Sequence, residues 1–140
     1  MLQDGKIPVV GMDSTAGRLG LLVIGHGSRR SAANDLLVAV TAALAERVPA
    51  HAVEAAYLEL ARPTIGEAYA GLVAAGCDRL VVHPYFLYPG AHTVSDIPAA
   101  LATAAAEHGA LPWVLTEPLN LDPRIVDVVA DRVTTALEAL

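Results

Sequence analysis

Residues 21–35 read LLVIGHGSRRSAAND, and this stretch carries the strongest indication of the fold. Four aliphatic residues run directly into a glycine, a histidine and a second glycine, and a segment with a helical pattern follows. A short, uninterrupted apolar run is typical of a strand buried on both faces, as in a parallel sheet covered by helices. The sequence therefore predicts a buried strand over residues 20–24 that presents His26 at its carboxyl end.

The alternation of an apolar run with a helical pattern occurs four times along the chain. The predicted strands cover residues 20–24, 52–60, 79–87 and 111–115, and the predicted helices cover about 31–47, 64–76, 95–109 and the segment after Pro123. Thr64 and Glu67 form a capping-box pair at the start of the second helix. Ser95 is the expected N-cap of the third helix, with Pro98 tolerated in its first turn.

Strands separated by helices of this length require right-handed crossovers and a parallel sheet with helices on both faces. We therefore expect one α/β domain, a three-layer sandwich around a four-stranded parallel sheet. With 140 residues the chain is long enough to bury a core of its own. We expect residues 20–140 to form this domain. Residues 1–19 are punctuated by Gly, Pro and Ser and lack the pattern of a signal peptide, so they are expected to be a flexible extension.

The composition limits the classes of function. Hydrophobic residues make up 54% of the sequence and charged residues 17%, against roughly 25% charged residues in an average soluble domain. Alanine accounts for part of this difference, and the remainder suggests a subunit interface. The net charge of −6 argues against nucleic acid as a partner. A single cysteine, Cys77, and no apolar segment of membrane-spanning length predict a cytoplasmic protein.

Ligands of open parallel sheets bind beyond the carboxyl ends of the strands. Three loops meet at this rim: GHGSRR after the first strand, ELARPT after the second and YPGAHTVS after the third. The topology therefore brings His26, Glu59 and His92 to one edge. Both histidines have small neighbours, which leave the imidazole unobstructed and let a bulky ligand approach the backbone.

These residues allow more than one chemistry. Two neutral imidazoles suit a borderline divalent cation such as cobalt, nickel, iron or zinc, and they are equally suited to act as acid and base. A carboxylate at Glu59 can take a proton or orient a histidine, and it can also be a solvated strand end. Ser28, Arg29 and Arg30 lie where the first helix begins, and amides at a helix N-terminus attract anions.

Three stretches together carry a resemblance to a known family. IGHGSRRSAAND, YLELARPTIGEA and FLYPGAHTVSDIPAAL resemble the sirohydrochlorin chelatases of the small CbiX and SirB type, within the class II chelatases. The similarity covers about residues 20–135, with the motifs in the family's order and spacing. It implies a chelatase-like (flavodoxin-like) fold and, for a single-domain chain, a homodimer. The implied reaction is that of a lyase that inserts Co²⁺, Fe²⁺ or Ni²⁺ into sirohydrochlorin or a related tetrapyrrole without ATP.

The resemblance also implies roles for individual residues. His26 is a metal ligand and proton acceptor, His92 is the second metal ligand, and the metal is a substrate, with no permanently bound cofactor. The catalytic residues are expected to be His26, Glu59 and His92, and the tetrapyrrole is expected to contact Glu59 and the loop of Leu87, Tyr88, Pro89, Gly90 and Ala91. Ser28 and Arg29, at the helix end that attracts anions, are expected to bind the substrate as well. Many relatives carry a basic residue where this chain has Ala91. Arg29, Arg30 and Arg62 would then supply the positive field for a polycarboxylate.

Two other classes of function are alternatives to the enzyme. A non-enzymatic carrier of metal or tetrapyrrole would use the same histidines and would bind without turnover. A flavodoxin-like regulatory module would need an acidic cluster or a flavin loop at the rim, and the sequence has neither. Histidine sites do not select one metal by affinity alone. Iron would point to siroheme, cobalt to cobalamin and nickel to another tetrapyrrole.

Overall fold

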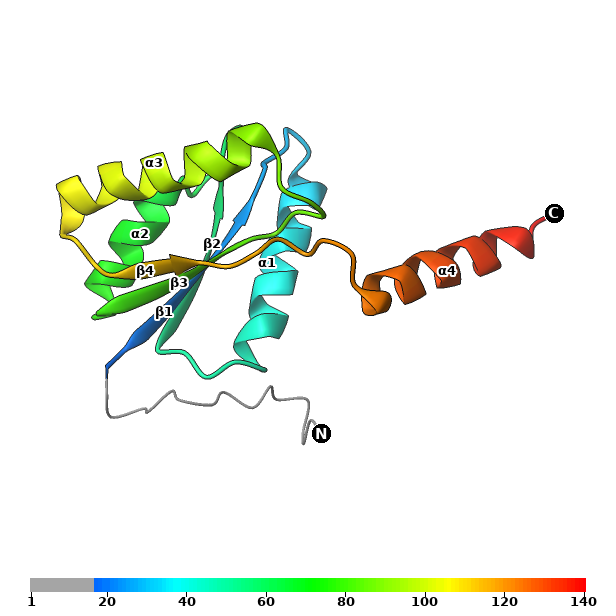
Figure 1. The fold of residues 1–140 in the computed structure, drawn as a ribbon, viewed down its shortest axis with the longest axis horizontal. Coiled ribbons are helices and arrows are strands. Elements are labelled where there is room, and N and C mark those ends of the chain that lie inside the picture. The colour runs from blue at the N-terminus through cyan, green and yellow to red at the C-terminus, as the bar shows by residue number, and fades with distance from the viewer. Residues whose placement is uncertain (1–16) are drawn as a thin grey trace.

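The computed structural model describes residues 17–140, apart from the side chains of Ala91, His92 and Val94. The elements are β1 Leu19–Gly25, α1 Ser31–Ala45, β2 Ala52–Tyr57, α2 Ile65–Ala74, β3 Arg79–Pro84, α3 Ala91–His108, β4 Trp113–Leu115 and α4 Pro123–Leu137. The strands form a single parallel sheet in the order β2-β1-β3-β4 (Figure 1). The prediction of an α/β fold around a four-stranded parallel sheet is confirmed. The predicted extension lies outside the described residues for its first sixteen positions.

The central strand β1 is buried along its whole length, which explains its continuous apolar sequence. Leu22 and Ile24 point to one face of the sheet and pack in the main core under α2 and α3. Val23 points to the other face and packs with Leu37 of α1 and Tyr57 of β2. The sheet is therefore the middle layer, with α1 on one side and α2 and α3 on the other (Figure 1).

Helix α2 begins and ends as its sequence predicts. The Thr64 hydroxyl accepts a hydrogen bond from the Glu67 amide at 3.2 Å, and the Thr64 amide donates to the Glu67 carboxylate at 2.9 Å. At the other end Gly76 has a φ of +92°. Its amide donates to Val73, and the next amide donates to Leu72, which is the double hydrogen bond of a Schellman motif.

Two predicted strands are shorter in the structure. β2 ends at Tyr57 rather than at residue 60, because the backbone at Leu60 is left-handed (φ 64°) and the chain returns to place the Pro63 carbonyl against the Tyr57 amide. β3 ends at Pro84 rather than at residue 87. There the Phe86 amide turns back to donate to the Pro84 carbonyl.

Helix α3 begins at Ala91, four residues before the predicted N-cap Ser95. Gly90 is the observed N-cap, and the Thr93 hydroxyl bonds to both its amide (3.1 Å) and its carbonyl (2.9 Å). Pro98 consequently lies inside the helix, not in its first turn. The predicted start was wrong because Pro98, a residue typical of a first helical turn, lies inside this helix. As a result His92 belongs to the first turn of α3.

The last helix, α4, starts where the sequence predicts but does not flank the sheet. The Asp122 carboxylate caps it by accepting a hydrogen bond from the Arg124 amide at 2.9 Å, and Pro123 occupies its first turn. Figure 1 shows α4 running away from the body, and none of its residues is buried. Among the described residues, no helix combines the length and the apolar character needed to span a bilayer.

Candidate active site

The carboxyl ends of β1 and β2 bring His26 and Glu59 together. The Glu59 amide donates to the His26 carbonyl at 3.0 Å, and the Leu58 amide donates to the Gly25 carbonyl at 3.0 Å, so the two loops leave the sheet as a pair. The Nε2 atom of His26 lies 3.3 Å from Oε1 of Glu59, with the two side chains 61% and 57% exposed. The topology thus brings these two side chains to one rim, as predicted.

The glycines on either side of His26 serve the packing of the protein itself. A Cβ at Gly25 would lie 2.8 Å from the side chain of Leu37, and a Cβ at Gly27 would overlap the carbonyl oxygen of Glu59. Gly27 also has a φ of +99°, in the left-handed region that side chains rarely adopt. The two loops can therefore approach each other because position 27 has no side chain. The structure assigns these glycines to internal contacts rather than to room for a ligand.

Both ring nitrogens of His26 face oxygen atoms. Nδ1 lies 3.2 Å from the Gly27 carbonyl oxygen, and Nε2 faces the Glu59 carboxylate. A carbonyl oxygen only accepts hydrogen bonds, so this contact forms when the proton is on Nδ1 and the lone pair is on Nε2. The space between Nε2 and the carboxylate then suits a positive species, either a proton or a metal cation.

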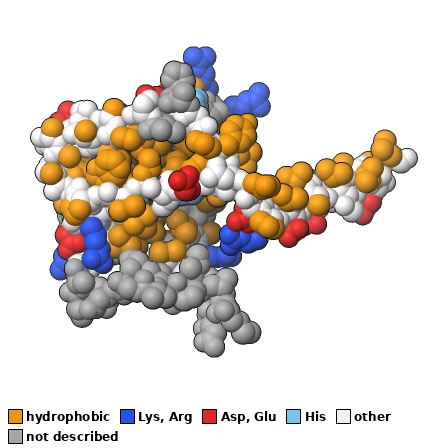
Figure 2. Space-filling model, viewed as in Figure 1, with side chains coloured by type: hydrophobic (Ala, Val, Ile, Leu, Met, Phe, Trp, Pro, Cys, Tyr) orange, Lys and Arg blue, Asp and Glu red, His pale blue; other side chains and the backbone are white. Residues whose placement is uncertain are grey.

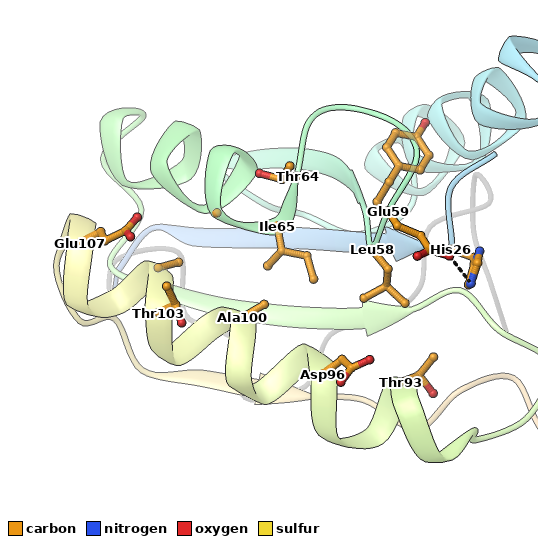
Figure 3. Close-up of a pocket in the computed structure, with 13 residues that line it drawn as sticks. His26, Leu58, Glu59, Thr64, Ile65, Thr93, Asp96, Ala100, Thr103 and Glu107 are labelled. Atoms are coloured by element: carbon orange, nitrogen blue, oxygen red, sulfur yellow. Dashed lines mark ion pairs between the residues drawn. The ribbon is translucent and has the colours of Figure 1, made fainter. Parts of the chain in front are cut away.

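His26 and Glu59 stand at one end of a cavity of about 710 Å³ between the loop after β2, the start of α2 and the length of α3 (Figure 3). The wall formed by α3 carries Thr93, Asp96, Ala100, Thr103, Ala104 and Glu107. The carboxylates of Glu59, Asp96 and Glu107 line the cavity, and no lysine or arginine of the described residues does. The cavity therefore favours a cation over an anion.

Asp96 is a lining residue that the sequence reasoning did not single out. It lies four positions after His92 in α3, and residues with this spacing share one face of a helix. In Figure 3 it extends from α3 on the wall opposite Leu58. The spacing would have indicated Asp96 if the helix had been predicted to start at residue 91.

The polar residues at the start of α1 hold the shape of the loop after β1. The Ser28 amide donates to the Asn34 side chain at 2.9 Å, and Asn34 donates back to the Ser28 carbonyl at 2.8 Å. The Ser28 hydroxyl accepts from the Arg30 amide at 3.0 Å. The amides of Ser28 and Arg30 are therefore already hydrogen-bonded within the chain. An anion at this helix end would instead bind the exposed side chains of Arg29 and Arg30.

Arg62 does not supply the free positive charge that was expected of it. Its guanidinium group makes a two-point ion pair with the Glu67 carboxylate. The same pair, together with the hydrogen bond from the Thr64 amide, lowers the pKa of Glu67 to about 2. Arg62 therefore completes the capping structure at the start of α2.

The loop after β3 presents apolar side chains to solvent. Leu87 is 55% and Tyr88 73% exposed, and Pro89 and Gly90 are exposed as well. Tyr88 and Pro89 line a second cavity of about 270 Å³, and Thr93 borders this cavity as well as the larger one. His92 follows in the first turn of α3. Ala91 and His92 are placed by their backbone only, so their predicted contacts lie outside the described side chains.

His83, inside β3, has a structural environment. Its Nδ1 lies 2.7 Å from the Thr116 hydroxyl, and its ring makes an edge contact with Tyr85 at 6.4 Å between centroids. Burial lowers the pKa of His83 below its usual value, because it disfavours the charged form. A neutral, hydrogen-bonded histidine in a strand agrees with the structural role that its position suggests.

Within the described side chains, no group of three or more histidine, cysteine, aspartate or glutamate residues is arranged to hold a metal. His26 and Glu59 supply one nitrogen and one carboxylate. A cation between them would therefore keep most of its coordination positions open, as in sites where a metal exchanges ligands during a reaction.

Comparison with known proteins identifies a matching family and several similar proteins. The profile of the CbiX family matches residues 20–136. The chloroplastic sirohydrochlorin ferrochelatase of Arabidopsis thaliana is 38% identical over 118 residues, which cover 84% of this chain and 52% of that protein. The sirohydrochlorin cobaltochelatase of Methanothermobacter thermautotrophicus is 33% identical over 144 residues and is covered completely, with 90% of this chain matched.

Solved structures agree with these sequence matches. The sirohydrochlorin chelatase SirB of Bacillus subtilis subspecies spizizenii, in complex with cobalt, superposes with a TM-score of 0.79 at 30% identity over 84% of this chain and 50% of that one. The CbiX protein of Marinobacter aquaeolei superposes with a TM-score of 0.70 at 28% identity and is covered to 99%. The chain thus spans about half the length of the plant and B. subtilis proteins and nearly the whole length of the other two.

Proposed function

Because the chain belongs to the CbiX family, we propose that it is a chelatase that inserts Co²⁺, Fe²⁺ or Ni²⁺ into sirohydrochlorin or a related tetrapyrrole without ATP. The observation that carries this proposal is the pair of His26 and Glu59 at the mouth of an acidic cavity. The names of the relatives, which are sirohydrochlorin ferrochelatases and cobaltochelatases, support the choice of substrates.

In the proposed mechanism, the chain first holds the metal substrate at the rim. The Gly27 carbonyl orients the imidazole of His26 so that the Nε2 lone pair faces the cavity. Nε2 and the Glu59 carboxylate bind the cation, and His92, in the first turn of α3, is the proposed second nitrogen ligand. Because these few ligands leave coordination positions open, the pyrrole nitrogens can replace them one at a time.

Metal insertion releases two protons from the pyrrole nitrogens. His26 accepts one of them once the cation has moved to the macrocycle, because its Nε2 lone pair is then free, and the other passes to solvent at this exposed rim. Glu59 lies 3.3 Å away and stabilises the imidazolium that forms. The same pair therefore serves first as a metal ligand set and then as a base.

We propose that the tetrapyrrole lies over the loop from Leu87 to Ala91. The exposed side chains of Leu87 and Tyr88 offer an apolar surface to a flat ring. Arg29, with Arg30 beside it, binds peripheral carboxylates, and Ser28 positions Arg29 through its hydrogen bonds to Asn34. The acidic cavity repels those carboxylates, which directs the macrocycle towards the side of the arginines.

We further propose that the chain acts as a homodimer in the cytoplasm. The low charged fraction of the sequence supports a subunit interface. The match to about half of the SirB chain leaves room in that protein for a second unit of similar size, whose place a second copy would take here. Cys77, the single cysteine, is a buried free thiol, which suits a reducing compartment.

The test follows insertion of Co²⁺, Fe²⁺ or Ni²⁺ into sirohydrochlorin by the change in its absorbance. His26→Ala should lower kcat/KM by about 100-fold or more, and Glu59→Gln by a smaller factor, because both remove groups that bind the metal or the protons. His108→Ala is the matched control, since His108 also lies beside a glutamate, Glu107, at 3.7 Å. Full turnover by His26→Ala would contradict the mechanism. Stoichiometric binding of metal or sirohydrochlorin by the wild-type chain, without turnover, would identify a carrier.

A further inference from the structure

Asn34, the fourth residue of α1, holds the two peptide groups that flank Ser28. Its side-chain oxygen accepts a hydrogen bond from the Ser28 amide at 2.9 Å, and its side-chain nitrogen donates to the Ser28 carbonyl at 2.8 Å. An asparagine side chain offers an acceptor and a donor together, which neither an ionised aspartate nor an apolar side chain does. One side chain therefore fixes the loop between β1 and α1 at Ser28.

One of these two peptide groups also carries the oxygen atom that His26 faces. The Ser28 amide and the Gly27 carbonyl belong to the same peptide group, which is trans. In a trans peptide group the N–H and the C=O point in opposite directions. Because the N–H points to Asn34, the carbonyl points away from it, and the carbonyl oxygen lies 3.2 Å from Nδ1 of His26. Asn34 and the imidazole are thus at opposite ends of one rigid group.

The backbone at Gly27 needs such a restraint. Its φ is +99°, and glycine adopts many backbone conformations at little cost, so steric exclusion alone does not fix the peptide group that follows. The next side chains do not hold this group either, because Arg29 and Arg30 are exposed. Figure 2 shows Lys and Arg side chains projecting at the top of the molecule, where α1 begins. Within the described residues, the hydrogen bond to Asn34 is the restraint on the N–H side of this group.

Asn34 is itself held from the core. Its backbone carbonyl accepts a hydrogen bond from the hydroxyl of Tyr57 at 2.6 Å. Tyr57, the last residue of β2, is 4% exposed and packs with Val23 and Leu37. Because Asn34 binds a buried side chain on one side and the rim loop on the other, the core sets the position of the peptide group beside His26.

The direction of the Gly27 carbonyl decides which ring nitrogen of His26 carries the proton. The contact at Nδ1 is a hydrogen bond, and the contact of Nε2 with Glu59, at 3.3 Å, is an ion pair. A carbonyl bound at Nδ1 requires a proton on that atom and leaves the lone pair on Nε2. The hydrogen bond made by one ring nitrogen thus determines whether the other can bind a metal.

We propose that Asn34 is a positioning residue of the site: through the Gly27–Ser28 peptide group it sets the tautomer of His26 and keeps Nε2 available to the metal substrate. Asn34 acts through the direction of one carbonyl group and not by contact with the metal. The proposal rests on the proposed function, since it names a residue that prepares the same site.

The tautomer of His26 is measured by nitrogen NMR of the full chain labelled at its histidines, without metal or tetrapyrrole, at about pH 9, where histidine side chains are neutral. Glu59→Ala removes the exposed carboxylate that competes for the ring. In this variant the proton should lie mainly on Nδ1. Adding Asn34→Ala should move most of it to Nε2, the preference of a free histidine side chain. A proton mainly on Nε2 with Asn34 present, or on Nδ1 without it, would overturn the proposal.

Two further variants, both in the Glu59→Ala chain, separate positioning from a general loss of structure. Asn34→Asp keeps an acceptor for the Ser28 amide and should keep the proton on Nδ1. Thr41→Val removes a different hydrogen bond of α1, from the Thr41 hydroxyl to the Leu37 carbonyl at 2.7 Å, and should not change the tautomer. A shift of the proton to Nε2 in either variant would overturn the proposal. Glu59→Ala and Asn34→Asp keep the test decisive if Asn34→Ala does not fold.

The consequence for the site is measured as the binding of Co²⁺ alone, with Glu59 in place. Asn34→Ala should raise the Kd for Co²⁺ by about 10- to 100-fold, as is typical when the partner that orients a histidine ligand is lost, and Thr41→Val should leave it unchanged. In the His26→Ala chain, Asn34→Ala should have no further effect. An equal effect with and without His26 would overturn the proposal. Absence of metal insertion by the wild type would instead overturn the proposed function, because neither the tautomer nor Co²⁺ binding depends on turnover.

Discussion

Helices α2 and α4 begin in the same way, but the apolar side of α2 is buried and that of α4 is exposed. Each has a side chain at its N-cap that binds an amide of the first turn, Thr64 in one and Asp122 in the other. α2 buries four residues, Ile65, Ala68, Tyr69 and Leu72, whereas α4 buries none, although its apolar and polar sides are more sharply separated. Local sequence thus determines where a helix starts, and the connection before it determines what its apolar side meets.

The largest expected difference is in how much the apolar side of each helix contributes to the free energy of unfolding. Leu72→Ala removes a fully buried side chain from the main core and should lower the free energy of unfolding by about 2–5 kcal/mol. Val133→Ala should change it by less than about 0.5 kcal/mol when measured on the monomer, because the side chain is exposed there. Urea unfolding at low protein concentration measures both. Similar losses for the two variants would mean that α4 packs on its own chain.

A smaller difference is expected at the two caps. Thr64→Ala removes the capping box and should lower the free energy of unfolding by about 1 kcal/mol, seen as a shift of the whole transition. Asp122→Ala should fray α4 and reduce the helical signal in circular dichroism without moving the midpoint of the body. A shift of the midpoint by Asp122→Ala as large as that of Thr64→Ala would show that α4 unfolds together with the sheet.

The smallest expected effect concerns the sheet face that α1 leaves open. His83 lies on this face, and burial lowers its pKa in the folded state. Below the unfolded value of about 6.5 the unfolded chain therefore binds more protons, so stability is lost as the pH falls through this range. His83→Asn should make the free energy of unfolding less dependent on pH between 5 and 7. His108→Asn is the control, and equal slopes for the wild type and His83→Asn would contradict the prediction.

The parts of the fold that could be predicted depend on residues close together in the sequence. Thr64 with Glu67, and Asp122 with Pro123, identify two helix starts because each cap is complete within four residues. The meeting of His26 with Glu59 followed from topology alone, since parallel strands end at one edge. These predictions needed no knowledge of side-chain contacts.

The parts that could not be predicted depend on contacts between distant residues. The need for glycine at position 27 comes from the Glu59 carbonyl, 32 positions later (59 − 27). Pro98 suggested a later start for α3 because the hydrogen bonds between Thr93 and Gly90 that begin the helix leave no mark on its apolar pattern. The outward course of α4 depends on backbone hydrogen bonds to the loop after β3, which no local pattern reports.

The backbone link between the two loops has an evolutionary consequence. The Glu59 amide is held by the His26 carbonyl, and the close approach needs only that position 27 stay glycine. The positions of the two side chains are thus set by atoms that every amino acid except proline possesses. Either side chain can change by a single substitution without rebuilding the loop that carries the other. A lineage with this backbone can therefore vary the acid beside its histidine while the scaffold stays the same.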